Sequence, residues 1–380
     1  MVILSGEKVV ARIDFASFHH EPYPYQLLIW QQRIERTLQD ALQQCGHAVE
    51  RSTRLLRFAM DKAVVTAQIE AGCHEPEGQS PNLERMRELF CERTGDTVAQ
   101  LNNPAWMNAF AFSQRMPKRF IVERAILVGD AAHVHTGAGA QGMNTGIQDA
   151  LNLGWKLALT VLSAASPVLL QTYESERMPN ACNVLRTTLK YQWFQLPHGS
   201  FARLVAGAFF EAVVKIRPLG NAIAKLAGML NVNYKHSSLS RQDSRHGTRK
   251  TCAGWHVPAA PFRIGGRAAK LFDALRGTQA NLLLFAGVTP SVQTINALRD
   301  MKRAVEPLAS HLRVNNIFAS EADAEQAGAT DENTIVDGAQ HLQTAFGMHD
   351  PEIIYVRPDG YIGLRTQDPI ATPPEVAGPR

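Results

Sequence analysis

The chain has 380 residues, a length that fits two or three domains, and 45% of them are hydrophobic, which can supply a substantial core. The net charge of +4, from 39 basic and 35 acidic residues, is small and dispersed, so the composition argues against nucleic acid as a partner. Five cysteines without a C-x-x-C spacing argue against a disulfide framework and indicate a reducing, cytoplasmic compartment. The opening MVILSGEK is too short, and lacks the basic start, for a signal peptide.

Hydrophobic periodicity predicts the elements of the first third of the chain. A helix is expected over residues 28–45 and a strand over 63–69. A second helix is expected over 83–94, because a proline precedes it and its charged residues share one side. Alternation predicts an edge strand over 110–120, and an apolar run predicts a strand over 125–128.

The strand over 125–128 ends in Gly129-Asp130 and is followed by a glycine-rich loop and a helix from Asn144 to about Ser163. A helix start offers unpaired N–H groups and a partial positive charge, and glycines let an anionic ligand approach the main chain. Asp130 would stand at the carboxyl end of a strand, where it could accept hydrogen bonds from sugar-like hydroxyls. This pattern predicts a site for a nucleotide cofactor.

Gly137, Gly139 and Gly142 also spell G-x-G-x-x-G, the fingerprint of a Rossmann unit. In that unit the first glycine follows the strand almost at once, and an acidic residue ends a second strand about 20 residues later. Here seven residues separate Gly129 from Gly137, and a helix follows. We therefore interpret the three glycines as part of the Gly-Asp loop.

The Gly-Asp segment resembles the second FAD-binding motif of the aromatic-ring flavoprotein monooxygenases, the group of p-hydroxybenzoate, phenol and 3-(3-hydroxyphenyl)propionate hydroxylases. The matching residues are Gly129, Asp130, Ala131, Ala132, His133, Gln141, Gly142, Asn144, Gly146, Asp149, Ala150, Asn152, Leu153, Trp155 and Lys156. The resemblance implies that Asp130 holds the ribitol chain of FAD and that the loop and helix start lie along the pyrophosphate and the flavin. The implied cofactor-binding residues are Gly129, Asp130, Gly139, Gln141, Gly142, Met143 and Asn144. The chain departs from the motif at Gly137, where proline is usual, and at Ala140, where glycine is usual.

The resemblance also implies a fold class, an α/β protein with a partial FAD-binding domain of glutathione-reductase type over residues 1–240. Residues 23–35 resemble the family segment with a Gln-x-x-Glu pattern. Upstream of it the family has a βαβ unit with a true G-x-G-x-x-G, and after the strand over 63–69 it has an Asp-Gly motif. Neither is found at the corresponding place in this sequence.

A polar stretch over 237–250 is expected to separate this domain from a second one over 250–370. Strands are predicted over 280–287 and 313–320, and a hairpin over 353–365 with a Pro-Asp-Gly turn. This part resembles the thioredoxin-like C-terminal domain of phenol-hydroxylase-type members. It has no C-x-x-C, so a structural role is expected.

Two further segments receive structural interpretations. Tyr173, Glu174, Arg177 and Pro179 match the family pattern Tyr-Glu-x-x-Arg-x-Pro. Arg177 is expected to tie helix ends together through bidentate bonds and not to take part in catalysis. The apolar residues 201–230 are interrupted by charges and predict a packed helix pair. A subunit interface in a homodimer and a peripheral membrane contact are the alternatives.

Few side chains are candidates for direct chemistry, and no catalytic residue is assigned. His133 and His135 could ligate a metal, but no third ligand is evident and no metal is expected. Arg115 could lie near the flavin ring or pair with a surface carboxylate. His19, His20 and Tyr25 could face a ring substrate or lie in solvent.

The resemblance implies an FAD-dependent monooxygenase that uses NAD(P)H and molecular oxygen to hydroxylate a small phenolic substrate. Because the sequence lacks two family motifs, impaired activity is expected. The alternative is a catalytically inactive remnant or interaction protein that no longer binds FAD.

Overall fold

The computed structural model describes residues 2–5, 8–12, 25, 27, 29–61, 64–72, 82–94, 101–104, 107, 113–134, 141–195, 216, 222, 225, 228–244, 251–264, 267–329 and 331–367.

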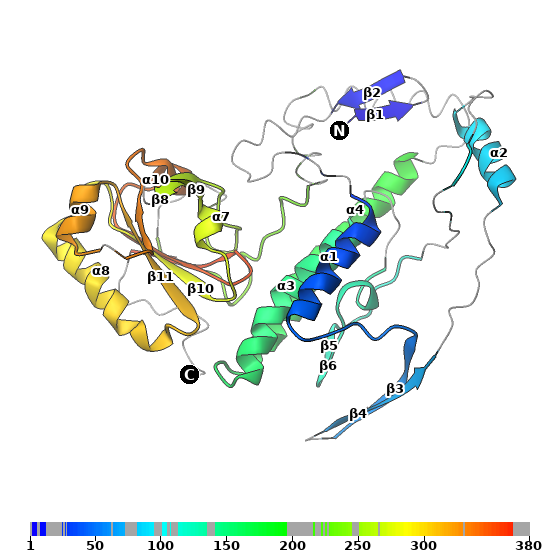
Figure 1. Ribbon diagram of the computed structural model, residues 1–380, viewed down its shortest axis with the longest axis horizontal. Helices are drawn as coiled ribbons and strands as arrows, with labels where there is room; N and C mark the ends of the chain where they lie inside the picture. Colours follow the sequence, from blue (N-terminus) through cyan, green and yellow to red (C-terminus); the bar gives the residue numbers. More distant parts are fainter. Residues whose placement is uncertain are drawn as a thin grey trace.

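A mixed eight-stranded sheet organises the C-terminal part of the chain (Figure 1). Its strand order is β7-β14-β13-β10-β11-β12-β8-β9. The strands are β7 (Arg241–Gln242), β8 (Pro261–Ile264), β9 (Arg267–Lys270), β10 (Ala280–Phe285), β11 (Leu312–Phe318), β12 (Thr334–Val336), β13 (Glu352–Val356) and β14 (Ile362–Thr366). The central strands β10, β11 and β12 are parallel, whereas β13 and β14 run antiparallel to their inner neighbours.

The central strand β10 is buried on both faces of this sheet, which explains why its sequence ANLLLF is almost continuously apolar. Leu283 and Phe285 belong to a core on one face, and Leu282 and Leu284 to a core on the other. This division follows from the two-residue period of a strand. The sheet is therefore the best-packed part of the described chain.

Short helices and turns connect these strands. They are α7 (Leu271–Ala274), α8 (Val292–Ala304), η2 (Glu306–Leu308), α9 (Glu321–Gln326) and α10 (His341–Phe346). The α8 helix, capped by the Ser291 hydroxyl, links β10 to β11 as the crossover that a parallel pair requires. The β13–β14 connection needs Gly360, whose φ is +81° and whose Cβ would lie 2.7 Å from Nε2 of His256.

Two long helices form the other packed unit of the chain. They are α3 (Gly142–Val161) and α4 (Val168–Gln195), which contains Pro179. Between them and the preceding segment lies a small core in which Phe120, Leu153 and Tyr173 are buried. The short strands β5 (Ile121–Val122) and β6 (Ala125–Ile126) lead into this unit.

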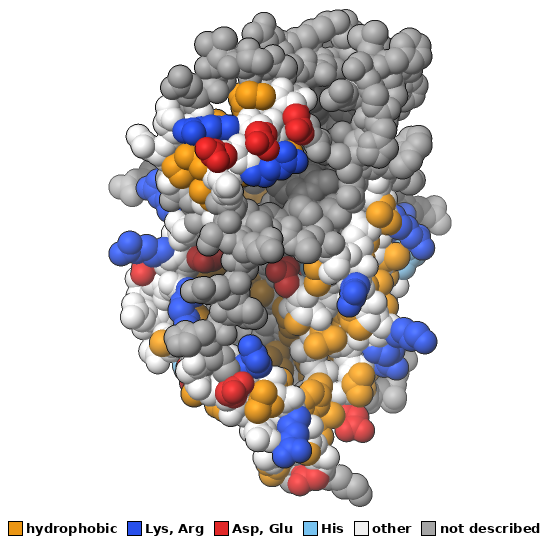
Figure 2. All heavy atoms as spheres, turned by 90° about the vertical axis from the view of Figure 1, so that its right-hand side faces the viewer, with side chains coloured by type: hydrophobic (Ala, Val, Ile, Leu, Met, Phe, Trp, Pro, Cys, Tyr) orange, Lys and Arg blue, Asp and Glu red, His pale blue; other side chains and the backbone are white. Residues whose placement is uncertain are grey.

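The N-terminal elements include a helix and a strand that bury little surface, α1 (Gln31–Gln44) and β4 (Val65–Ala71). The others are β1 (Val2–Ser5), β2 (Lys8–Arg12), β3 (Thr53–Met60) and α2 (Leu83–Thr94). No residue of α1 is buried, and every residue of β4 is exposed. Hydrophobic side chains such as Phe58 and Ile69 therefore stand on the surface of the β3–β4 hairpin. Figure 2 shows the molecule from the side on which this hairpin and α2 lie, with hydrophobic and basic side chains intermingled on its lower half.

Most expected elements are confirmed. The helices predicted over 28–45, 83–94 and 144–163 correspond to α1, α2 and α3, and the strand over 63–69 corresponds to β4. The C-terminal strands correspond to β10, β11, β13 and β14. In contrast, the strands β1, β2, β3, β5, β7, β8, β9 and β12 were not predicted.

The edge strand predicted over 110–120 is wrong over its described part, residues 113–120, which hold only an isolated bridge from Arg115 to Val134. At Phe120, the end of this segment, a side chain takes the place of a neighbouring strand. The Glu174 carboxylate accepts the N–H groups of Phe120 and Ile121 at 2.6 and 2.9 Å. Of the strand expected over 125–128, only Ala125 and Ile126 form a strand, β6, which pairs with β5.

Two other expectations concern segments that are described only in part. Most of residues 201–230, the predicted helix pair, lies outside the described residues. Within the polar stretch over 237–250, Arg241 and Gln242 form β7 beside β14, and residues 245–250 lie outside the described part. Among the described helices, none is both long and apolar enough to cross a membrane.

Candidate functional site

The Gly-Asp motif forms a tight turn directly after β6. Val128 is extended, and η1 (Gly129–Ala131) begins at Gly129 with a φ of +61°, a left-handed conformation that favours glycine. The turn lies against α3, because a Cβ on Gly146 would stand 3.4 Å from the Cα of Gly129. Asp130 is exposed, so its carboxylate can reach a ligand.

A buried carboxylate, Asp149 of α3, fixes this turn. Its Oδ2 accepts the Gly129 N–H at 3.2 Å and lies 2.6 Å from Nε2 of His133. Its Oδ1 accepts Nε of Arg177 at 2.6 Å, and the three side chains are at most 2% exposed. Burial alone would raise the pKa of Asp149, but the hydrogen bond from His133 and the charge of Arg177 outweigh it and lower the pKa.

Arg177 joins α4 to α3, although it binds the Asp149 carboxylate through Nε alone and not through the expected bidentate bonds. Besides the bond to Asp149, it donates to the Tyr234 hydroxyl at 3.0 Å and to the Thr145 carbonyl at 3.3 Å. We call Gly129, His133, Asp149, Arg177 and Tyr234 the Asp149 cluster. Within this cluster the His133 ring binds the Asp149 carboxylate. Among the described residues, no group of three side chains that could hold a metal ion is found. His135, the other histidine of the pair, lies outside them.

The N-terminus of α3 supplies the second part of the candidate site. Gln141 precedes the helix without a side-chain cap, and its carbonyl accepts the Thr145 N–H at 2.9 Å. The N–H groups of Gly142, Met143 and Asn144 belong to the first turn, where a helix has no internal acceptors. Met143 and Asn144 are exposed, whereas the Gln141 side chain is buried. Gly139 lies outside the described residues.

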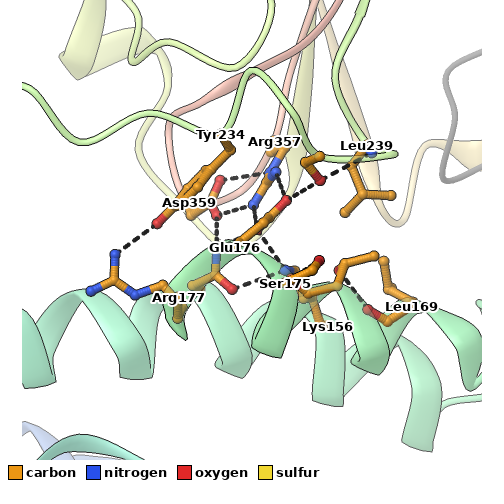
Figure 3. A network of polar contacts seen from close by, with 12 residues as sticks. Lys156, Leu169, Ser175, Glu176, Arg177, Tyr234, Leu239, Arg357 and Asp359 are labelled. Carbon is orange, nitrogen blue, oxygen red and sulfur yellow. Dashed lines mark hydrogen bonds and ion pairs between the residues drawn. The ribbon is translucent and has the colours of Figure 1, made fainter. Parts of the chain in front are cut away.

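A second buried cluster joins both helices to the β13–β14 connection (Figure 3). Arg357 binds Glu176 of α4 through two nearly parallel hydrogen bonds, of 2.7 and 2.9 Å. The same guanidinium binds Asp359, and Lys156 donates to Glu176 at 2.8 Å. Asn152 Nδ2 donates to Glu176 at 2.7 Å. We call Asn152, Lys156, Glu176, Arg357 and Asp359 the Arg357 cluster.

Burial and charge act against each other in the Arg357 cluster. Burial alone would raise the pKa of Glu176, but the charges of Arg357 and Lys156 outweigh it and lower the pKa to about 2. For Lys156, burial is the stronger effect, and the pKa falls to about 8 although the charge of Glu176 opposes the shift. The cluster is therefore a set of buried charges that depend on one another.

Neither cluster was predicted from the sequence, although Arg177 was given a tying role. A signal was present in α3, where the buried polar residues Thr145, Asp149, Asn152 and Lys156 recur every three or four positions. This spacing places them on one face of the helix. A polar stripe on the buried face of an otherwise apolar helix indicates partners in the core.

Of the other candidate residues, only Arg115 and Tyr25 belong to the described part of the chain. Arg115 is exposed, and its backbone pairs with Val134 directly after the Gly-Asp turn. Tyr25 is 58% exposed, and His19 and His20 lie outside the described residues.

Comparison with known families matches residues 74–188, which include the Gly-Asp turn and α3, to a family described as FAD binding domain. A flavin-dependent monooxygenase of Mycobacteroides abscessus is 38% identical over 213 residues, which are 56% of this chain and 39% of the relative. Pentachlorophenol 4-monooxygenase of Sphingobium chlorophenolicum is 30% identical over 292 residues, 75% of this chain and 50% of the relative. The chain thus spans half or less of the length of these relatives.

A solved structure has the same fold. Anhydrotetracycline hydroxylase OxyS from Streptomyces rimosus superimposes with a TM-score of 0.69, at 21% identity, over 93% of this chain and 79% of that structure. The two proteins therefore share a fold over most of this chain.

Proposed function

Since this chain carries an FAD-binding domain and is homologous to flavin-dependent aromatic monooxygenases, we propose that it binds FAD at the Gly129–Asp130 turn and the N-terminus of α3. The activity that goes with this site is the hydroxylation of a small phenolic compound with NAD(P)H and molecular oxygen as co-substrates, and we propose that this activity is impaired in the chain as it stands. One observation carries this proposal. An exposed carboxylate, Asp130, stands on a turn that a buried cluster fixes against α3.

The residues present suit FAD in two ways. The Asp130 carboxylate can accept hydrogen bonds from the hydroxyls of the ribitol chain. The first-turn N–H groups of Gly142, Met143 and Asn144 offer donors and partial positive charge, which favour the negative charge of the pyrophosphate or of reduced flavin. Gly139 and Gln141 complete the proposed set. When bound, FAD supplies the redox and oxygen chemistry, and the protein supplies orientation and a dry surrounding.

Replacing Asp130 by alanine should weaken FAD binding by about one to two orders of magnitude, since a hydrogen bond to a charged group contributes about 1.5–3 kcal/mol. Flavin fluorescence titration measures the change. Glu325→Ala, which removes an exposed carboxylate on α9, is the matched control and should bind as the unaltered protein does. Equal affinity of Asp130→Ala and the control would exclude the proposed role of Asp130.

The described residues that we assign to FAD belong to one turn and one helix start, so we propose that the chain by itself binds FAD weakly. It should purify colourless, bind added FAD saturably in a titration, and show no NAD(P)H oxidation stimulated by phenols. An inactive remnant would also be colourless but would show no saturable binding. A stoichiometrically yellow protein with phenol-stimulated NAD(P)H oxidation would contradict the proposal of weak binding.

We further propose a division into an FAD-binding domain over 1–240 and a thioredoxin-like domain over 250–370. The strand order β14-β13-β10-β11, with a parallel central pair and two antiparallel strands beside it, supports the second domain. A cytoplasmic location accords with five cysteines that lack a C-x-x-C spacing. A homodimer is part of the proposal without structural support.

A further inference from the structure

The two buried clusters meet at consecutive residues of α4. Glu176 binds Arg357 and Lys156, whereas Arg177 binds Asp149 and Tyr234. Figure 3 shows Glu176 and Arg177 on the helix, with Arg357 bound to Glu176 and Tyr234 bound to Arg177. Buried polar contacts therefore lead from the C-terminal sheet to Glu176, and from the next residue, Arg177, to the helix that fixes the Gly-Asp turn.

Tyr234 connects the clusters a second time. Its hydroxyl accepts a hydrogen bond from Arg177, and the Arg357 guanidinium lies 5.1 Å from the centre of its ring. The Tyr361 ring, beside the β13–β14 turn, lies 4.3 Å from the same ring. A shift of Arg357 would thus displace Arg177 by two routes, through Glu176 on the same helix and through the Tyr234 ring.

The backbone of the Gly-Asp turn is held by Asp149, the last residue in this series of contacts. The Gly129 N–H donates to Asp149, and the His133 ring lies 2.6 Å from the same carboxylate oxygen. Asp149 in turn is oriented by Arg177, whose Nε donates to the other oxygen at 2.6 Å. Both ends of the turn are therefore held by one carboxylate, and that carboxylate by one arginine.

We propose that Arg357 is a positioning residue for the Gly129–His133 turn, acting through Glu176, Tyr234 and Arg177. The C-terminal sheet then forms part of the cofactor site without touching the cofactor. The link to FAD rests on the proposed function, but the effect on the turn does not.

The test compares two conservative variants of the full chain, Arg357→Lys and Arg365→Lys. Arg365 is an internal match, because it is equally buried and binds Glu352 through two hydrogen bonds of 2.8 Å, and its other hydrogen bonds run to Thr251. Both variants keep the charge and lose the planar fork of the guanidinium. A general loosening of the C-terminal sheet would therefore affect both alike.

The first readout is amide hydrogen exchange of peptides that cover residues 127–134, measured without ligand. We expect exchange about tenfold faster in Arg357→Lys, a factor within the usual range of coupling between sites, and no change in Arg365→Lys. Equal exchange of the turn in both variants would overturn the proposal. If Arg357→Lys does not fold, Tyr234→Phe replaces it, and unchanged exchange of the turn in that variant would overturn the proposal equally.

The second readout is FAD affinity by fluorescence titration. We expect the dissociation constant to rise about tenfold in Arg357→Lys and to stay unchanged in Arg365→Lys. An unaltered protein that fails to bind FAD would refute the proposed function, while hydrogen exchange would still decide the role of Arg357. Binding by the unaltered protein with equal affinity in both variants would refute the link from Arg357 to the cofactor.

Discussion

Asp149→Ala should lower the free energy of unfolding by about 3–5 kcal/mol, the cost of removing one partner of a buried ion pair. Arg177 would keep a buried positive charge without its carboxylate, and the Gly129 N–H and the His133 ring would lose a shared acceptor. Urea unfolding followed by circular dichroism measures the difference.

The matched control for this prediction is Asp331→Ala, which breaks an ion pair with Lys302 at side chains that are about 40% exposed. Exposed pairs contribute about 0–1 kcal/mol, so the loss there should be small. If both variants lost the same amount, Asp149 would not be the anchor of the turn.

Stability should fall as the pH drops below about 4.5, in part because of Glu176. Its pKa is lowered from 4.5 to about 2 in the folded protein, so the folded state favours the carboxylate more than the unfolded state does. The resulting stabilisation is present above pH 4.5 and is lost as the pH falls towards 2. The shift corresponds to about 3 kcal/mol.

Glu176→Gln isolates this contribution from that of other acidic groups. The variant should be less stable than the unaltered protein at pH 7, and the gap should narrow between pH 4.5 and the lowest pH at which both fold. Urea midpoints at a series of pH values provide the comparison. Glu325→Gln, an exposed position, should show a gap that does not change with pH. A constant gap for Glu176→Gln would show that its carboxylate is not preferentially ionised in the folded state.

The sequence predicted the elements whose hydrophobic pattern is local. The helices α1, α2 and α3 and the strands β10 and β11 lie within a few residues of the predicted ranges, because period and turn residues are properties of a short stretch of chain. The strand predicted over 110–120 is wrong over residues 113–120, because alternation is typical of a strand but the Phe120 N–H binds the Glu174 carboxylate, 54 residues away, in place of a neighbouring strand. Only the packed chain decides such a partner.

For the candidate site too, some features follow from the sequence and others only from the tertiary structure. The sequence by itself determined the order strand, Gly129-Asp130, glycine-rich loop and helix, and hence the chemistry of a helix start beside an acidic turn. The tertiary structure decided what holds that turn: Asp149 and Arg177 are 28 residues apart, and Glu176 and Arg357 are 181 residues apart. Buried charges must find partners with correct geometry. Which charges meet depends on how the two helices and the C-terminal sheet pack, and no local pattern contains that information.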